Sequence, residues 1–74
     1  MKVEVLLFNF LRDGRGKVVS MDVNEGTTVN DLIRLLEIED DVVANVLVNQ
    51  ADAEFFSLLK EGDSVSLFPL LAGG

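Results

Sequence analysis

The chain contains no cysteine, no histidine, no tryptophan and no tyrosine. Without cysteine it has no disulfide, no thiolate metal ligand and no iron–sulfur cluster, and without histidine the Ser-His and Cys-His nucleophile pairs are excluded. Its aspartates and glutamates form no recognisable acid–base pair in the sequence, and no serine lies beside a base. We therefore expect a protein that is not itself an enzyme and has no cofactor of its own.

Basic residues are also scarce: 6 Lys and Arg stand against 13 Asp and Glu, which gives a net charge of −7. Such a surface repels phosphate backbones and anionic lipid headgroups, so we expect neither nucleic acid nor a membrane as partner. The acidic segment 37–41 lacks the alternating oxygen spacing of a calcium site, and we expect a solvated face that steers the protein towards a positively charged partner, with no metal bound. Arg12, Arg15 and Lys17 form a basic tip to which the sequence assigns no role.

Long hydrophobic runs are absent too, whereas a bilayer-spanning helix needs about 20 apolar residues. The first residues, Met1 to Phe8, include Glu4 and lack a small-residue cleavage site, so they do not read as a signal peptide. A chain of 74 residues is long enough for one domain only. Apolar residues nevertheless make up 49% of it, more than a small interior can bury, and we expect the surplus to form a partner-binding surface. We expect a soluble, cytoplasmic protein.

Alternation of apolar and polar residues predicts two strands at the start of the chain, over Lys2–Phe8 and Lys17–Val23. Between them lies the turn 12–16, which contains two glycines, residues for which positive φ angles cost little. Two strands joined by such a turn predict a β-hairpin.

A helix is predicted to follow, opening at Thr27-Thr28 and ending near Glu37. Thr28 can cap the first backbone N–H groups, with Asp31 three residues further on. Four apolar residues then recur at helical spacing and define one buried face. They are Val29, Leu32, Ile33 and Leu36.

The second half of the chain predicts two more strands. We expect the first at Asn45–Val48 and the last at Ser64–Phe68, where Pro69 ends it because proline cannot donate to a ladder. Between them, segment 51–59 is ambiguous, and we expect an irregular turn or a stub of 3₁₀ helix to place its large apolar residues in the core. These are Phe55, Phe56, Leu58 and Leu59.

The order of these elements predicts an α+β fold with one main helix on a mixed sheet of four to five strands. We expect a domain over residues 1–68 and a flexible tail over residues 69–74, which ends in Gly73-Gly74. Two residues without side chains can enter a slot that any Cβ would block. There the Gly74 carboxylate can be adenylated by ATP, after which a persulfide yields a thiocarboxylate and an amine yields an amide.

Three segments together carry a family resemblance: Val46-Leu47-Val48-Asn49-Gln50, Glu61-Gly62-Asp63 and the ending Leu67-Phe68-Pro69-Leu70-Leu71-Ala72-Gly73-Gly74. With them the chain resembles the ubiquitin-like β-grasp sulfur carriers, most closely the small subunit of molybdopterin synthase. The resemblance implies that an ATP-dependent, ubiquitin-activating-type enzyme adenylates Gly74, which then becomes a thiocarboxylate. It also implies insertion of the tail into the large catalytic subunit of molybdopterin synthase, where sulfur passes to the pterin precursor of the molybdenum or tungsten cofactor.

Two sets of site residues follow. Besides the reactive Gly74, we expect five residues to insert into a partner: Pro69, Leu70, Leu71, Ala72 and Gly73. In the β-grasp topology the first and last strands are central neighbours, so apolar side chains that point away from the helix should cluster beside the tail and bind partners. These are Leu6, Phe8, Leu47 and Phe68.

Other functions stay open on the sequence alone. The same adenylation leads to a ubiquitin-like protein modifier if a lysine ε-amine attacks Gly74. A sulfur carrier could instead serve thiamine thiazole synthesis or transfer RNA thiolation. A β-grasp interaction module in which the tail has no role is the remaining alternative.

Overall fold

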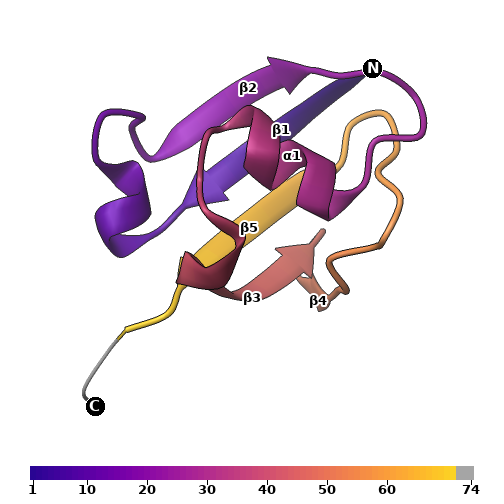
Figure 1. The fold of residues 1–74 in the computed structure, drawn as a ribbon. Coiled ribbons are helices and arrows are strands. Elements are labelled where there is room, and N and C mark those ends of the chain that lie inside the picture. The colour runs from indigo at the N-terminus through magenta and orange to yellow at the C-terminus, as the bar shows by residue number, and fades with distance from the viewer. Residues whose placement is uncertain (72–74) are drawn as a thin grey trace.

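The computed structural model describes residues 1–71 of the chain (Figure 1). Within residues 1–71, five strands, one α-helix and two short 3₁₀ helices follow one another. They are β1 (Lys2–Leu7), η1 (Asn9–Arg12), β2 (Val18–Asp22), α1 (Val29–Leu35), η2 (Asp40–Val42), β3 (Val43–Val48), β4 (Ala51–Asp52) and β5 (Ser64–Pro69).

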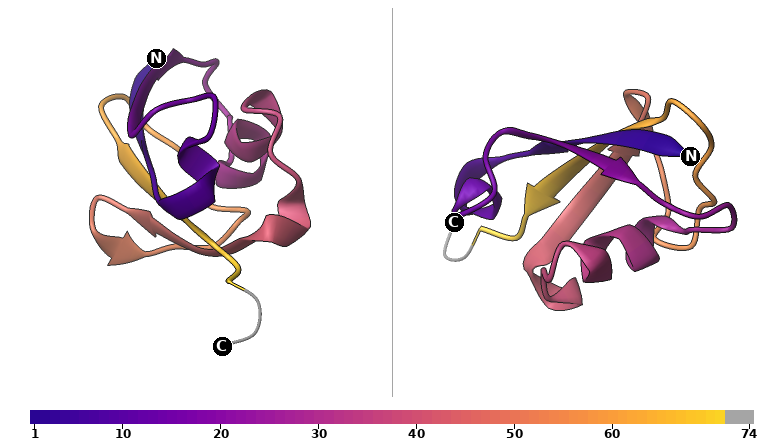
Figure 2. Two further views of the ribbon diagram at one scale, coloured as in Figure 1. Left: turned by 90° about the vertical axis from the view of Figure 1, so that its left-hand side faces the viewer. Right: turned by 90° about the horizontal axis from the view of Figure 1, so that it is seen from above.

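The strands form one mixed sheet in the order β2-β1-β5-β3-β4. Strand β1 is antiparallel to β2 and parallel to β5, and β3 is antiparallel to both β5 and β4. Figure 2 shows α1 lying against one face of this sheet, while the other face has no helix over it. The predicted fold, a mixed sheet on one main helix with β1 and β5 at its centre, is confirmed. The two-residue strand β4 was not predicted.

Helix α1 begins as predicted, with a complete capping box. The Asp31 N–H donates to Thr28 Oγ1 at 3.1 Å, and the Thr28 N–H donates to Asp31 Oδ2 at 3.0 Å. These bonds hold the pKa of the Asp31 carboxyl below its ordinary value, mainly through the backbone hydrogen bond from Thr28. The helix ends at Leu35, slightly before the predicted end near Glu37, and Glu37 itself has φ of 60°, outside the helical region.

The core lies between the inner faces of the central strands and α1. Alternate residues of β1 point into it, and three of the four residues in the predicted apolar stripe of α1 are fully buried. Together these side chains form one continuous cluster. Its buried members are Val3, Val5, Leu7, Leu11, Val23, Val29, Leu32, Ile33, Ile38, Val43, Val46, Leu59, Val65 and Leu67.

Within the predicted segment 51–59, residues 53–59 follow β4 and have the expected irregular course. Their side chains depart from the prediction, because Leu59 alone of the large apolar ones is buried. The other three are exposed, by 36% for Phe55, 76% for Phe56 and 64% for Leu58. The physical reason lies in the backbone, since the N–H groups of Val29 and Asn30 at the start of α1 donate to carbonyl groups of this segment. These bonds keep the segment alongside the start of the helix, so the segment does not fold inward beneath α1.

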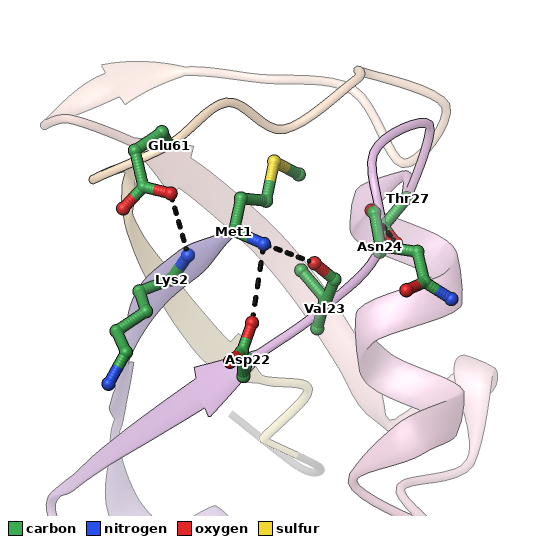
Figure 3. A network of polar contacts seen from close by, with 7 residues as sticks. All are labelled: Met1, Lys2, Asp22, Val23, Asn24, Thr27 and Glu61. Atoms are coloured by element: carbon green, nitrogen blue, oxygen red, sulfur yellow. Dashed lines mark hydrogen bonds and ion pairs between the residues drawn. The ribbon is translucent and has the colours of Figure 1, made fainter.

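Polar contacts tie the start of β1 to its neighbours, as Figure 3 shows. The amino group of Met1 donates to the Val23 carbonyl at 2.7 Å and to the Asp22 carboxylate at 3.2 Å. The Lys2 N–H donates to the Glu61 carboxylate at 3.1 Å. Strand β1 is thereby fixed to the end of β2 and to the turn that precedes β5.

No helix among residues 1–71 is long and apolar enough to cross a membrane. The same residues include no cluster of three or more acidic side chains placed to hold a metal ion. In the same part of the chain, one ion pair involves the acidic segment 37–41, that of Arg34 with Asp40 at 3.6 Å, and both side chains are exposed.

Candidate functional site

Strand β5 connects the core directly to the tail. Val65 and Leu67 of β5 are fully buried, and the chain leaves the sheet after Pro69. The Leu70 N–H donates to the Val42 carbonyl at 2.8 Å, which fixes the base of the tail against the start of β3. Leu70 and Leu71 each expose 60% of their surface. The predicted reactive residue, Gly74, lies outside the described residues, as do Ala72 and Gly73.

The four predicted patch residues lie on the sheet face opposite α1, and we call them the outer-face patch: Leu6, Phe8, Leu47 and Phe68. Register explains why they meet. Leu6 of β1 and Leu47 of β3 both pair with the same residue of β5, Ser66, which lies between them. Leu7 pairs with Leu67, so Phe8 and Phe68 follow side by side. All four side chains are half-buried. Their role in partner binding stays a prediction.

The two aromatic rings of the outer-face patch stack on each other. The ring centroids of Phe8 and Phe68 are 4.4 Å apart, and the ring planes differ by 15°. A pair of this kind contributes about 0.5–1.5 kcal/mol beyond the burial of its area. The stack links the end of β1 to the last residues of β5, next to the point where the tail begins.

Arg12 had no role predicted from the sequence, yet its side chain borders the patch. Its guanidinium carbon lies 5.5 Å from the centroid of the Phe8 ring, and Nε donates to the Leu7 carbonyl at 2.7 Å. The 3₁₀ helix η1 turns the chain back after Phe8 and brings Arg12 over the ring. The one available signal was the four-residue spacing between Phe8 and Arg12, which is too common to single out a cation–π pair.

Val18 extends the same surface and was also missed. It pairs with Leu6 across the β1–β2 ladder and exposes 51% of its surface. The outer face therefore offers an apolar, partly aromatic area with a cation at one edge and the tail at its end. Such a surface is suited to binding a partner. The patch itself supplies no acid, base or nucleophile. The reactive group that this surface could position is therefore the chain terminus.

The comparisons with known proteins agree with this geometry. The model of the ThiS family matches residues 5–74. Among solved structures, the Haloferax volcanii HVO 2177 protein is 32% identical, with 100% of this chain and 87% of that chain covered and a TM-score of 0.81. No curated protein has significant sequence similarity to the chain.

Two further solved structures have names that state a function. A putative molybdopterin converting factor, subunit 1, from Pyrococcus furiosus is 28% identical, with 96% of this chain and 99% of that chain covered and a TM-score of 0.79. The small archaeal modifier protein 1 of H. volcanii is 26% identical, with 95% and 98% covered and a TM-score of 0.77. Because the family model spans nearly the whole sequence, the chain belongs to the ThiS family of ubiquitin-like β-grasp proteins, which comprises sulfur carriers and protein modifiers.

Proposed function

We propose that this protein is a sulfur carrier for molybdopterin synthesis and acts as the small, non-catalytic subunit of molybdopterin synthase in the cytoplasm. The observation that carries the proposal is the continuity of β5, which joins the outer-face patch to a tail ending in Gly73-Gly74. Similarity to the P. furiosus molybdopterin converting factor subunit supports the choice of pathway.

The chemistry takes place at the main-chain terminus. In the first step the Gly74 carboxylate attacks the α-phosphorus of ATP, and pyrophosphate leaves. A persulfide then attacks the acyl carbon of the adenylate and AMP leaves, after which a thiol reduces the acyl disulfide and releases the thiocarboxylate. Every reacting group except the carboxylate belongs to other molecules, in keeping with a chain that lacks cysteine and histidine.

The folded body has the task of presenting this terminus. We propose that an ATP-dependent, ubiquitin-activating-type enzyme and the large catalytic subunit of molybdopterin synthase bind the outer-face patch in turn. Pro69, Leu70 and Leu71 would then lie in a partner groove, followed by Ala72. Gly73 and Gly74 would pass through a slot too narrow for a side chain.

Intact-mass measurement tests the proposal. The protein is incubated with a purified adenylating enzyme of this type, ATP and a sulfur source. We expect a mass gain equal to one exchange of oxygen for sulfur, and we expect the Gly74→Ala variant to gain nothing. The loaded protein, mixed with the large synthase subunit and the pterin precursor, should then form molybdopterin and return to its starting mass. Equal loading of Gly74→Ala would contradict the proposal.

A protein modifier is the second candidate, favoured by the similarity to the small archaeal modifier protein 1. In that case a lysine amine attacks the activated Gly74 and forms an amide. Tryptic digestion of proteins from cells that express the chain would then yield lysines that carry the remnant of residues 61–74, because Lys60 is the last basic residue of the chain. This remnant would be absent when Gly73 and Gly74 are deleted. Loading without transfer to the pterin precursor would point instead to thiamine thiazole synthesis or transfer RNA thiolation.

A further inference from the structure

A second group of exposed apolar side chains lies away from the outer-face patch. It consists of Phe55, Phe56 and Leu58, which we call the helix-edge patch. The side chain of Phe56 is the most exposed of the large apolar residues in the described part of the chain. Single exposed apolar residues are ordinary on protein surfaces, but three within four positions of one segment are an unusual concentration.

The backbone beneath the helix-edge patch is held in place by hydrogen bonds. The Asn30 N–H donates to the Phe55 carbonyl at 2.8 Å, and the Val29 N–H donates to the Ser57 carbonyl at 3.0 Å. Leu58 forms a bridge with Thr28. Because these bonds also satisfy free N–H groups of α1, the segment cannot collapse inward without exposing them. The patch is therefore presented in a fixed shape, which lowers the entropy that a partner must remove on binding.

A cleft adjoins the patch. Its volume is about 270 Å³, and its wall is mixed. Leu58, Val48 and Ala53 form the apolar part, and the polar part consists of Asn49, Asp52, Ser57, Lys60 and Asp63. The cleft is large enough to take an apolar side chain from another protein. An exposed apolar surface beside a cleft of this size is typical of the centre of a protein interface.

The charges around the patch define the chemistry of its partner. Three carboxylates lie around the patch. Asp52 lines the cleft and Glu54 directly precedes Phe55. Asp31 follows Asn30, whose N–H donates to the Phe55 carbonyl. All three carboxylates are exposed, and the capping box keeps the pKa of Asp31 low, so that it stays charged. Lys60 at the cleft is the cation beside them. A partner surface complementary to this arrangement carries lysine or arginine around an apolar side chain.

The helix-edge patch lies at the opposite end of β5 from the tail. Segment 53–59 leads into the start of β5, whereas the tail leaves from its end, as Figure 1 shows. Six residues of strand separate the two, and the helix-edge patch borders α1, whereas the outer-face patch lies on the opposite side of the sheet. Binding at one of these surfaces therefore leaves the other accessible.

We propose that Phe55, Phe56, Leu58 and the adjoining cleft form a second docking surface, which binds a protein segment carrying an apolar side chain flanked by lysine or arginine. This surface goes beyond the proposed sulfur-carrier function and does not depend on it. It allows a second protein to hold the carrier while the tail is engaged elsewhere.

Amide chemical-shift mapping of the full chain tests the inference. The probe is a synthetic amphipathic peptide of roughly 15 residues, long enough to form a helix on binding, with leucines on one face and lysines on the other. We expect saturable shifts at residues 52–60 and 28–31. A matched peptide with glutamate in place of lysine should produce none. Shifts centred on Phe8 and Phe68, or equal binding of the glutamate peptide, would overturn the inference.

Matched variants complete the test. Phe56→Ser and Leu58→Ser should each weaken binding of the lysine peptide by about tenfold or more. Leu35→Ser, which removes a leucine exposed to a similar extent, 59%, on α1, should not. All three variants should still gain sulfur at Gly74. Failure of the docking proposal can therefore be distinguished from failure of the proposed carrier function. Equal weakening by Leu35→Ser, or self-association that depends on Phe56 and accounts for the shifts, would also overturn the proposal.

Discussion

Phe8 and Phe68 face each other across two neighbouring strands, so a smaller side chain at either position removes their ring stack without opening a cavity in the core. The rings are half-buried in the free protein. At this position a single residue contributes both to the stability of the fold and to the proposed partner-binding surface.

We therefore expect Phe8→Leu to lower the free energy of unfolding by about 1 kcal/mol, because the aromatic pair is lost while most apolar area is kept. Urea denaturation measures the change. Phe10→Leu is the control, since Phe10 is also partly exposed, by 39%, and lies outside this stack. Equal losses in the two variants would show that the stack contributes nothing specific.

Asp31 gives a prediction on pH. Its pKa lies below the ordinary value of 3.8, first because of the backbone hydrogen bond from Thr28. A carboxyl whose pKa is lower in the folded chain than in the unfolded chain stabilises the fold at pH values above its ordinary pKa. This stabilisation disappears as the pH falls through the lowered pKa.

The Asp31→Asn variant should accordingly be less stable than the native chain at neutral pH, and the difference should shrink as the pH falls below about 4. Urea denaturation from neutral to acidic pH measures the two curves. A difference that stays constant over this range would mean that the charge on Asp31 has no part in capping α1.

At the scale of elements, a single side chain joins the first loop to the end of α1. The Arg15 guanidinium donates to the carbonyls of Leu36 and Glu37 at 3.2 and 3.3 Å, and to those of Leu11 and Asp13 at 3.3 and 3.4 Å. A cation at this position also complements the negative end of the helix dipole.

Arg15→Met should lower the free energy of unfolding by about 1–2 kcal/mol, because it leaves the carbonyls at the helix end without this donor. Arg34→Met is the matched control. It removes an exposed ion pair with Asp40, whose loss costs about 0–1 kcal/mol. Thermal or urea denaturation of both variants checks the prediction, and a smaller effect at Arg15 than at Arg34 would contradict it.

Local patterns were enough to predict the elements whose causes are local. The capping pair Thr28 and Asp31, the apolar stripe of α1 and the alternation in β1 each follow from neighbouring residues, and each is found in the structure. Strand β4, with two residues, is too short for alternation to mark it.

Segment 53–59 could not be predicted in this way, because its course depends on hydrogen bonds to residues 29 and 30, far away in the sequence. The outer-face patch could be predicted in part from local patterns. Alternation placed its four residues on the outer side of their strands, but the parallel pairing of β1 with β5 followed only from the resemblance to a known topology. Arg12 was missed because its position over Phe8 depends on η1.

For the whole molecule, the net charge of −7 predicts how binding responds to salt. Acidic residues are concentrated in segment 37–41, and an extended negative potential accelerates encounter with a positively charged partner. Screening shortens the reach of this potential, since the Debye length falls from about 10 Å at 0.1 M salt to about 3 Å at 1 M.

The association rate constant with the proposed adenylating enzyme should therefore fall by about tenfold over this range of salt, while the dissociation rate constant changes little. Stopped-flow measurements give both constants. Replacing Asp40 and Asp41 by asparagine should lower the association rate constant at low salt and make it depend less on the salt concentration. A rate that is independent of salt would show that charge does not guide the encounter.

The parallel pairing of β1 with β5 has a mechanical consequence. The amino end of β1 and the carboxyl end of β5 lie at opposite ends of one ladder at the centre of the sheet. A pull between the amino terminus and the tail loads this ladder in shear, so that its hydrogen bonds must rupture together instead of unzipping one by one. Forced unfolding is governed by such a barrier and not by equilibrium stability. A pull on the tail against the amino terminus is thus resisted strongly by the body.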